Sequence, residues 1–272
     1  MLEFIDRYDD FAMYCAELGF LVVGNDMLGH GAFVTSDANY GYFAPGNGSR
    51  VLIADIRKLL QLANPDHSLP HFMLGHSMGS FLTRQYLCMY GKDLDGAIIC
   101  GTAYYSGLET GFGKVLCKMI ARRRGWHYRS KFVTNLSVGG YNNRIEPVRT
   151  EYDWLTRDEQ VVDRYRKDPR TQFMFTLNGY YGLFSSLKYL TDPSNLRRMP
   201  RSLPVFFISG DLDPVGNYGA GVKKVVAQFQ GLNMEDVTCR IYPNDRHEVL
   251  NELNKEEVYE DVTGWMKKHI RK

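Results

Sequence analysis

The chain has 272 residues, of which 44% are hydrophobic and 24% are charged, and its formal net charge is +2. This is ordinary globular composition, and so small a net charge gives no reason to expect nucleic acid or an acidic partner. No apolar run reaches membrane-spanning length, and the N-terminus lacks the basic-then-apolar pattern of a secretion signal. Five widely spaced cysteines without a C-x-x-C pair are interpreted as buried free thiols, so we expect a cytoplasmic protein.

Short apolar runs alternate with amphipathic segments along most of the chain. The first helix is predicted at residues 8–15, where apolar side chains recur at i, i+3, i+4 and i+7. A β-rich run at 20–23 follows, then a long Gly- and Asn-rich loop to residue 47. The later elements are a helix at 52–63, a strand at 71–74, a helix at 81–90, strands at 96–100 and 205–208, a helix at 222–229, a strand at 237–242 and a final helix capped by Asn254 and Glu257. This alternation predicts an α/β fold, with a mainly parallel sheet and helices on both of its faces.

The strand rhythm stops over residues 102–201. This stretch is rich in aromatic and basic residues and is predicted to be mostly helical, with Thr156 and Glu159 matching a capping box. It is interpreted as an insertion over one end of the sheet. We therefore predict a core formed by residues 1–103 and 201–272, and a helical cap formed by residues 104–200.

The five residues from Gly75 to Gly79 spell G-x-S-x-G between a predicted strand and a predicted helix. A nucleophile elbow requires that context, because its serine sits on a sharp strand-to-helix turn with small residues two positions away. The helix would point its free N–H groups at Ser77, so the Met78 amide is a candidate donor to an oxyanion. A helix-capping serine in a Gly-rich loop is the alternative, and His76 is expected to be structural.

Ser77 needs a neighbouring base, and that base needs an orienting acid. In enzymes with such an elbow the acid and then the histidine follow the serine along the chain. Of the three histidines downstream, His127 lies in the basic part of the insertion and His269 lies beside two lysines in the last helix, where we expect it to be solvated. His247 follows a strand end, where this fold carries its site, and is our candidate base; an ordinary surface-loop histidine is the alternative.

Two aspartates leave the end of the strand at 205–208. Asp213, which precedes Pro214, is our candidate for the orienting acid. Asp211 is the alternative, and otherwise it would hydrogen-bond its own turn. Asp245 lies two residues before His247 and is interpreted as a loop residue.

Four motifs together resemble one branch of the α/β-hydrolase fold, which holds monoacylglycerol lipases, bacterial lysophospholipases and serine aminopeptidase-like hydrolases. They are G-H-S-M-G at 75–79, D-x-x-G-H-G at 26–31, G-D-L-D-P at 210–214 and R-H-E-x-L-N-E at 246–252. The resemblance covers the whole chain, insertion included. It implies Ser77 as nucleophile, Asp213 as acid, His247 as base and the Met78 amide as oxyanion donor, with no metal and no organic cofactor.

The N-terminus departs from that branch, whose members carry an H-G-x-x-E-H-like motif before the first helix. Glu3 matches the motif's glutamate, Phe4 replaces its histidine, and Met1 falls on the second oxyanion position. The H-G pair is absent, as are the strands before it, one of which lies beside the nucleophile strand in the family. We therefore expect a reading frame that starts at an internal methionine; the alternative is a natural short form whose sheet is completed differently.

The residues and the resemblance predict a serine carboxylic-ester hydrolase for a lipid-like substrate of the monoacylglycerol or lysophospholipid type. The alternatives are an aminopeptidase or amidase on the same triad, or a non-catalytic remnant or binding protein. Eight aromatic residues of the insertion suit the wall of an acyl pocket, although ordinary packing explains each one equally well: Tyr104, Tyr105, Phe112, Phe173, Phe175, Tyr180, Tyr181 and Phe184. Six basic residues suit transient contact with anionic lipid headgroups, although a solvated helix face is the simpler interpretation: Lys118, Arg122, Arg123, Arg124, Arg129 and Lys131.

Overall fold

A computed structural model describes residues 1–270. Its centre is one sheet of four parallel strands, which lie side by side in the order of the sequence. The strands are β1 (Phe72–His76), β2 (Gly96–Cys100), β3 (Val205–Gly210) and β4 (Val237–Tyr242). Because all four strands run the same way, their carboxyl ends meet at one edge of the sheet, and the polar residues that follow them are brought together there.

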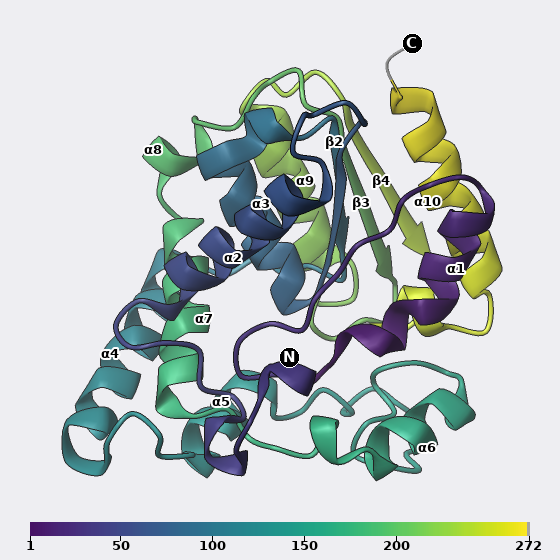
Figure 1. Cartoon of the computed structure of the whole chain (residues 1–272). Helices are drawn as coiled ribbons and strands as arrows, with labels where there is room; N and C mark the ends of the chain where they lie inside the picture. The colour runs from purple at the N-terminus through teal and green to yellow at the C-terminus, as the bar shows by residue number, and fades with distance from the viewer. Residues whose placement is uncertain (271–272) are drawn as a thin grey trace.

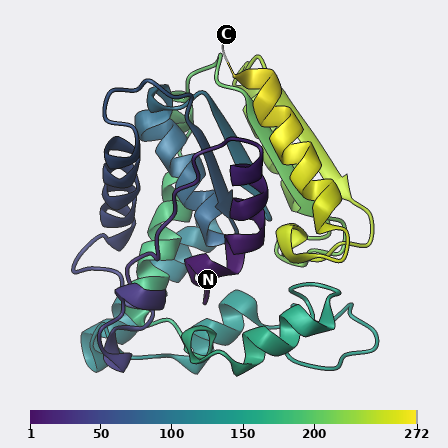
Figure 2. The ribbon, with the colours of Figure 1, turned by 45° about the vertical axis from the view of Figure 1, so that its right-hand side comes forward.

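Helices cover both faces of the sheet (Figure 1 and Figure 2). On one face α2 (Gly48–Ala63), α3 (Met78–Tyr90) and α9 (Ala220–Gly231) share a hydrophobic core with Ile99 and Phe207. On the other face α1 (Asp9–Glu17) and α10 (Lys255–His269) pack on the alternate strand residues, among them Ile98 and Phe206. The two sets alternate along each strand because successive side chains of a strand point to opposite faces.

The chain between β2 and β3 forms no strand within the described residues; it consists of helices and loops. Its helices are α4 (Gly107–Arg124), α5 (Lys131–Val138), α6 (Glu159–Lys167), α7 (Leu177–Tyr189) and α8 (Pro193–Leu196). Helices α5 and α6 lie below the carboxyl ends of the strands (Figure 1). Helix α7 packs against α4 but also against α2 and α3, so the last part of the insertion is joined to the core.

Short 3-10 helices occupy several of the loops. They are η1 (Ile5–Tyr8), η2 (Gly31–Phe33), η3 (Asp37–Asn39), η4 (Gly91–Asp93), η5 (Pro169–Thr171) and η6 (Val249–Asn251). No helix among residues 1–270 is both long enough and apolar enough to cross a membrane.

The α/β fold and most of its elements are confirmed, but the strand predicted at residues 20–23 is wrong. These residues have no regular secondary structure, and Leu21, Val22 and Val23 are exposed. A β-rich segment becomes a strand only when a neighbour supplies a hydrogen-bonding ladder. Strand β1 lies at the edge of the sheet, with β2 as its single neighbour among the described residues. No described segment pairs with residues 20–23.

The capping box predicted from Thr156 and Glu159 is wrong, whereas the cap predicted at Asn254 and Glu257 is confirmed in position: Asn254 directly precedes α10, and its side-chain amide donates to Glu257 at 3.3 Å. Helix α6 begins after Asp158, whose carboxylate accepts from the amides of Gln160 and Val161, while the Thr156 hydroxyl donates to the Asn251 carbonyl. At α10 the Asn254 side chain makes no cap hydrogen bond to the helix backbone. Thr156 does not cap a helix and instead joins the insertion to the loop before α10.

The cysteine prediction holds for four of the five residues. All five thiols are free, and Cys15, Cys88, Cys100 and Cys117 are buried. Cys239 is exposed, because β4 is the last strand of the sheet and its middle residues are not covered.

Candidate active site

Ser77 occupies the turn between β1 and α3 in a backbone conformation that few residues adopt, with φ 53° and ψ −117°. Its amide donates to the Cys100 carbonyl at 3.0 Å, which ties the turn to the end of β2. A Cβ atom at Gly75 would overlap Thr83 and the carbonyl of Gly79, so the elbow requires glycine there. At Gly79 a Cβ would meet nothing within 4 Å, so a small residue is needed on only one side of Ser77.

Two methionines were predicted to supply oxyanion donors. Met78 is the first residue of α3, where backbone N–H groups have no acceptor within the helix. Met1 lines the same cavity as Ser77 and Met78.

His247 and Asp213 lie together at the ends of neighbouring strands. Nδ1 of His247 is 3.0 Å from Oδ1 of Asp213, and both side chains are buried. The separation is that of an ion pair, although the ring N–H direction does not satisfy hydrogen-bond geometry. Asp213 also accepts from the Val215 amide at 2.8 Å and the Ser209 hydroxyl at 3.3 Å. These contacts fix the carboxylate behind the imidazole.

His247 and Ser77 line one cavity, and the base packs closely on its surroundings. A Cβ at Gly101, which follows β2 with φ +58°, would lie 3.1 Å from Cε1 of His247. Glycine therefore allows the imidazole to approach the sheet edge. The ring of Trp154 lies on the cap side of the imidazole, with 5.1 Å between the ring centroids. Neither Gly101 nor Trp154 was identified from the sequence.

The two other aspartates considered for the acid have different partners. Asp211 Oδ1 accepts from the Asn244 amide at 2.7 Å, so it joins two loops rather than bonding its own turn. Asp245 is fully buried and is bound by Arg157 and Asn254. Asp213 is the aspartate that reaches the imidazole.

The remaining downstream histidines do not enter the site. His127 stacks on Tyr42 with 4.1 Å between ring centroids. The prediction that His269 is solvated is wrong. Its ring nitrogens contact the Trp265 carbonyl at 2.7 Å and the Asp236 carboxylate at 3.0 Å.

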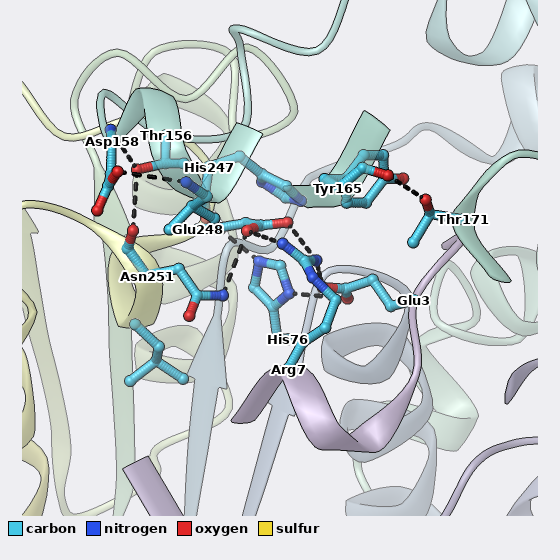
Figure 3. Close-up of polar contacts among 12 residues, drawn as sticks. Glu3, Arg7, His76, Thr156, Asp158, Tyr165, Thr171, His247, Glu248 and Asn251 are labelled. Carbon is cyan, nitrogen blue, oxygen red and sulfur yellow. Dashed lines mark hydrogen bonds and ion pairs between the residues drawn. The ribbon is translucent and has the colours of Figure 1, made fainter. Parts of the chain in front are cut away.

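His76, expected to be structural, links the N-terminal segment to the catalytic loop. Its Nδ1 lies 2.9 Å from the Tyr8 hydroxyl and 3.3 Å from Glu3, and its Nε2 lies 3.2 Å from the His247 carbonyl oxygen (Figure 3). Burial alone would lower the pKa of His76, but the hydrogen bond and charge of Glu3 outweigh it and raise the pKa. A protonated His76 would donate on both sides.

A buried ion pair with Arg7 holds Glu248, the residue that follows the candidate base. Arg7 donates to both carboxylate oxygens of Glu248, at 2.8 and 2.7 Å, and also to Glu3 (Figure 3). A forked, charge-assisted contact of this kind is geometrically specific. Arg7 carried no sequence signal, because its partner lies 241 positions away.

The D-x-x-G-H-G motif braces the N-terminal segment against the long loop, and none of its residues lines the cavity. The Asp26 carboxylate accepts from the amides of Ile5 at 2.8 Å and Ala32 at 2.6 Å, so it joins the first residues to the long loop. Gly31 has φ +49°, and a Cβ there would overlap that carboxylate. His30 is buried against Phe43 and other aromatic rings, and burial lowers its pKa to about 4.

A cavity of about 630 Å³ opens onto Ser77 and His247. Six of the eight aromatic residues predicted to wall a pocket line it: Tyr105, Phe112, Phe173, Phe175, Tyr180 and Phe184. Tyr104 and Tyr181 do not. Among the described residues that line the cavity none is Lys or Arg, whereas four are Glu. Glu3 and Glu248 are paired with Arg7, while Glu109 and Glu151 are exposed.

No group of three or more His, Cys, Asp or Glu side chains among residues 1–270 is placed to hold a metal ion. The site brings together a serine on a strained strand-to-helix turn and an aspartate–histidine pair at two later strand ends. Together with the parallel sheet and the helical insertion, they define a hydrolase of the α/β-hydrolase fold.

Comparison with known proteins agrees with this class. A family model described as serine aminopeptidase, S33, matches residues 1–254, and the chain belongs to this family. The chain is 27% identical to the monoacylglycerol lipase of Mycolicibacterium smegmatis, over 98% of this chain and 85% of the relative. It is 23% identical to the monoglyceride lipase of Homo sapiens, over 97% of this chain and 78% of that protein.

Solved structures are similar over nearly the whole chain. A carboxyl esterase from Bacillus coagulans in complex with glycerol matches with a TM-score of 0.90 and 27% identity, over 99% of this chain and 87% of the esterase. A lipase in an open form matches with a TM-score of 0.88 and 25% identity, over 100% and 88% of the two chains.

Proposed function

We propose that this protein hydrolyses carboxylic esters of lipid-like substrates through an acyl-enzyme on Ser77. The observation that carries the proposal is that Ser77 and His247 line one largely apolar cavity, while Asp213 lies 3.0 Å behind the imidazole. The similarity to proteins named monoacylglycerol lipase and carboxyl esterase supports ester chemistry.

In the proposed reaction His247 takes the proton of the Ser77 hydroxyl as the oxygen bonds to the ester carbonyl carbon. The oxyanion is stabilised by the Met78 N–H, with a second donor at the Met1 position. The bond to the alcohol then breaks, and His247 gives that alcohol its proton. Water attacks the acyl-enzyme, passes a proton to His247, and releases the acid as Ser77 regains its proton. Asp213 orients the imidazole and stabilises its charged form.

The charges of the cavity favour an uncharged head group. Exposed Glu109 and Glu151 line it and no lysine or arginine does; Glu151 is paired with Arg166 at 3.9 Å from outside the lining, so a phosphate would meet chiefly the Glu109 carboxylate. A glycerol head group carries no charge and avoids this repulsion. Of the two substrate types expected from the sequence, we therefore propose the monoacylglycerol type.

The same carboxylates support a second candidate function. An aminoacyl substrate carries a cationic amine, which Glu109 or Glu151 would attract, and the matching family model is described as a serine aminopeptidase. The acyl-enzyme chemistry would be identical, with an amine as leaving group. Chain length and head group separate the two candidates.

We expect the rate of hydrolysis to rise with acyl length from acetyl through octanoyl to dodecanoyl monoglycerides. Each methylene that becomes fully buried contributes about 0.8 kcal/mol, or up to about fourfold in kcat/KM. Initial rates on this series, and on aminoacyl anilides and lysophosphatidic acid at equal concentration, provide the measurement. A flat profile, or faster cleavage of the anilides, would reject the lipase-like proposal in favour of the second candidate.

We also propose that α4 rests on a lipid surface. Leu108, Phe112, Val115 and Met119 recur at four- and three-residue spacing and are all exposed, which places an apolar stripe along one side of the helix. Phe112 also lines the cavity, so the stripe adjoins the site. Exposed basic side chains near its end suit anionic headgroups: Lys118, Arg122 and Arg123.

Arg129 does not belong to this basic surface. Its guanidinium donates to the carbonyls of Met174, Asp37, Ala38 and Tyr40, so it ties the insertion to the long loop instead.

Replacing Leu108 and Met119 together by serine should weaken binding to phosphatidylglycerol vesicles about tenfold, since each loses an apolar contact with lipid. Cosedimentation measures the binding. Turnover of a water-soluble ester should stay unchanged, because neither residue lines the cavity. Leu62 and Leu253, 70% and 66% exposed on other elements, provide the matched serine control. Equal vesicle binding by both double variants would contradict the proposal.

A further inference from the structure

Residues 243–254, which lie between β4 and α10 and carry His247, lie against a segment of the insertion; we call them the base loop. The His247 amide donates to the Trp154 carbonyl at 3.3 Å, and the Glu248 amide donates to the Leu155 carbonyl at 2.7 Å. These hydrogen bonds involve the backbone of the base itself and of the next residue. The position of His247 is therefore set partly by residues 153–157, which we call the cap strut.

Arginine side chains fasten the cap strut from both directions. Arg246, in the base loop, donates to the carbonyls of Asp153 at 2.6 Å and Thr156 at 3.1 Å. Arg157, in the strut, donates through Nε to Glu252 at 3.0 Å. A terminal nitrogen of Arg157 reaches Asp245 at 2.5 Å and the Asn254 side-chain oxygen at 2.7 Å.

Arg157 stands between two buried carboxylates. Asp245 is 0% exposed and Glu252 is 1% exposed, whereas the Arg157 side chain is 28% exposed. Burial and the neighbouring charge of Glu252 raise the pKa of Asp245 to about 6 even with Arg157 in place. Without that guanidinium, two like charges would face each other out of water, which is strongly unfavourable. The loop and the strut therefore separate only at a considerable cost in free energy.

We propose that Arg157 is a positioning residue, which holds His247 in its working place by docking the cap strut against the base loop. Its contacts bracket the base, since Asp245 precedes His247 by two residues and Glu252 follows it by five. The inference rests on the proposed serine-hydrolase function. It adds that the insertion takes part in orienting the base as well as in walling the cavity.

Proton transfer from Ser77 depends on the separation and direction of the imidazole, and a misplacement of about 1 Å can cost about 10²-fold in rate. Substrate binding depends mainly on the cavity walls, and Arg157 does not line the cavity. Loss of the Arg157 contacts with Asp245 and Glu252 should therefore lower kcat while KM changes little. A residue that only stabilised the fold would not lower kcat selectively while leaving KM unchanged.

The test uses Arg157→Lys and Arg157→Gln in the full chain. Lysine keeps the charge but cannot reproduce the fork that reaches three partners. We expect kcat to fall about tenfold in the lysine variant and about 10²-fold in the glutamine variant, with KM within about twofold of the parent. The rate of fluorophosphonate labelling at Ser77 should fall in parallel.

Arg149→Lys is the matched control. Its side chain, 35% exposed, also forms ion pairs within the insertion, with Asp163 and Glu159, but it does not contact the base loop. If the Arg157 variants keep the kcat of this control, the inference is wrong.

A double variant keeps the test informative if Arg157→Gln folds poorly. Adding Asp245→Asn removes one buried charge, so the thermal midpoint should recover, while kcat should stay low because the fork is still missing. Recovery of both together would show a merely structural role and overturn the inference.

Hydrogen exchange supplies a measurement that does not depend on activity. The amides of His247 and Glu248 should exchange faster in Arg157→Lys than in Arg149→Lys, and equal exchange would contradict the inference. A parent protein that neither turns over esters nor labels with fluorophosphonate would instead count against the proposed function, while the exchange result would still decide whether Arg157 docks the strut.

Discussion

Ser77→Ala and His247→Ala are each expected to lower kcat by several orders of magnitude, on the order of 10⁶-fold if the three residues act as a unit. Without the hydroxyl no acyl-enzyme can form, and without the imidazole nothing removes its proton. The effects should not add in the double variant, because each change already abolishes the covalent route. Initial rates on a medium-chain monoglyceride, with KM determined separately, provide the measurement.

The thermal midpoint supplies the control for these variants. Ser77 makes its hydrogen bond through its amide rather than its side chain, so alanine should not unfold the elbow. Near-normal turnover by His247→Ala would show that another group is the base. Unchanged turnover by Ser77→Ala would show that the reaction does not pass through an acyl-enzyme on Ser77.

Asp213→Asn is expected to lower kcat by about 10⁴-fold. The carboxylate faces Nδ1 of His247 at 3.0 Å and favours the tautomer with a proton on that nitrogen. An amide can present N–H groups there, which would favour the opposite tautomer and leave Nε2 unable to accept the serine proton. The folded state should survive with reduced stability, because an asparagine oxygen at the Oδ2 position can still accept from the Ser209 hydroxyl, whereas the Val215 amide loses its acceptor at Oδ1.

Asp211→Asn is the paired comparison, and its effect on kcat should stay within a few-fold. Asp211 lies two residues away and leaves the same strand, but its carboxylate accepts from Asn244 and does not contact the imidazole. The same ester assay serves both variants. A large loss of kcat in Asp211→Asn together with a small loss in Asp213→Asn would show that Asp211 is the orienting acid.

Local sequence pattern was sufficient for the fold and for the residues that the fold brings together at the candidate site. Each strand that pairs in the sheet was predicted from its apolar run, and the elbow from five residues between a strand and a helix. His247 and Asp213 followed from their positions after strand ends, since parallel strands bring those ends together. Residues 20–23 failed because β propensity describes one segment, whereas a strand also needs a partner.

The groups that support the base were beyond the reach of local pattern. Arg7 reaches Glu248 across 241 positions, and Arg157 reaches Asp245 across 88. An arginine gives no sequence signal of which carboxylate it pairs with, so only the folded chain identifies these contacts. The failed capping box has the same origin, because Thr156 was assigned a local partner, whereas its hydroxyl donates to the Asn251 carbonyl, 95 positions away.

The charges along the cavity have a consequence for the end of the catalytic cycle. In the proposed reaction a neutral ester enters, whereas the released fatty acid ionises near neutral pH and would be an anion beside Glu109 and Glu151. The repulsion is absent for the substrate and present for the product, so it favours departure of the acid over its return. Fatty acid should therefore compete weakly for the site, and its addition at a fixed substrate concentration should lower the initial rate only slightly.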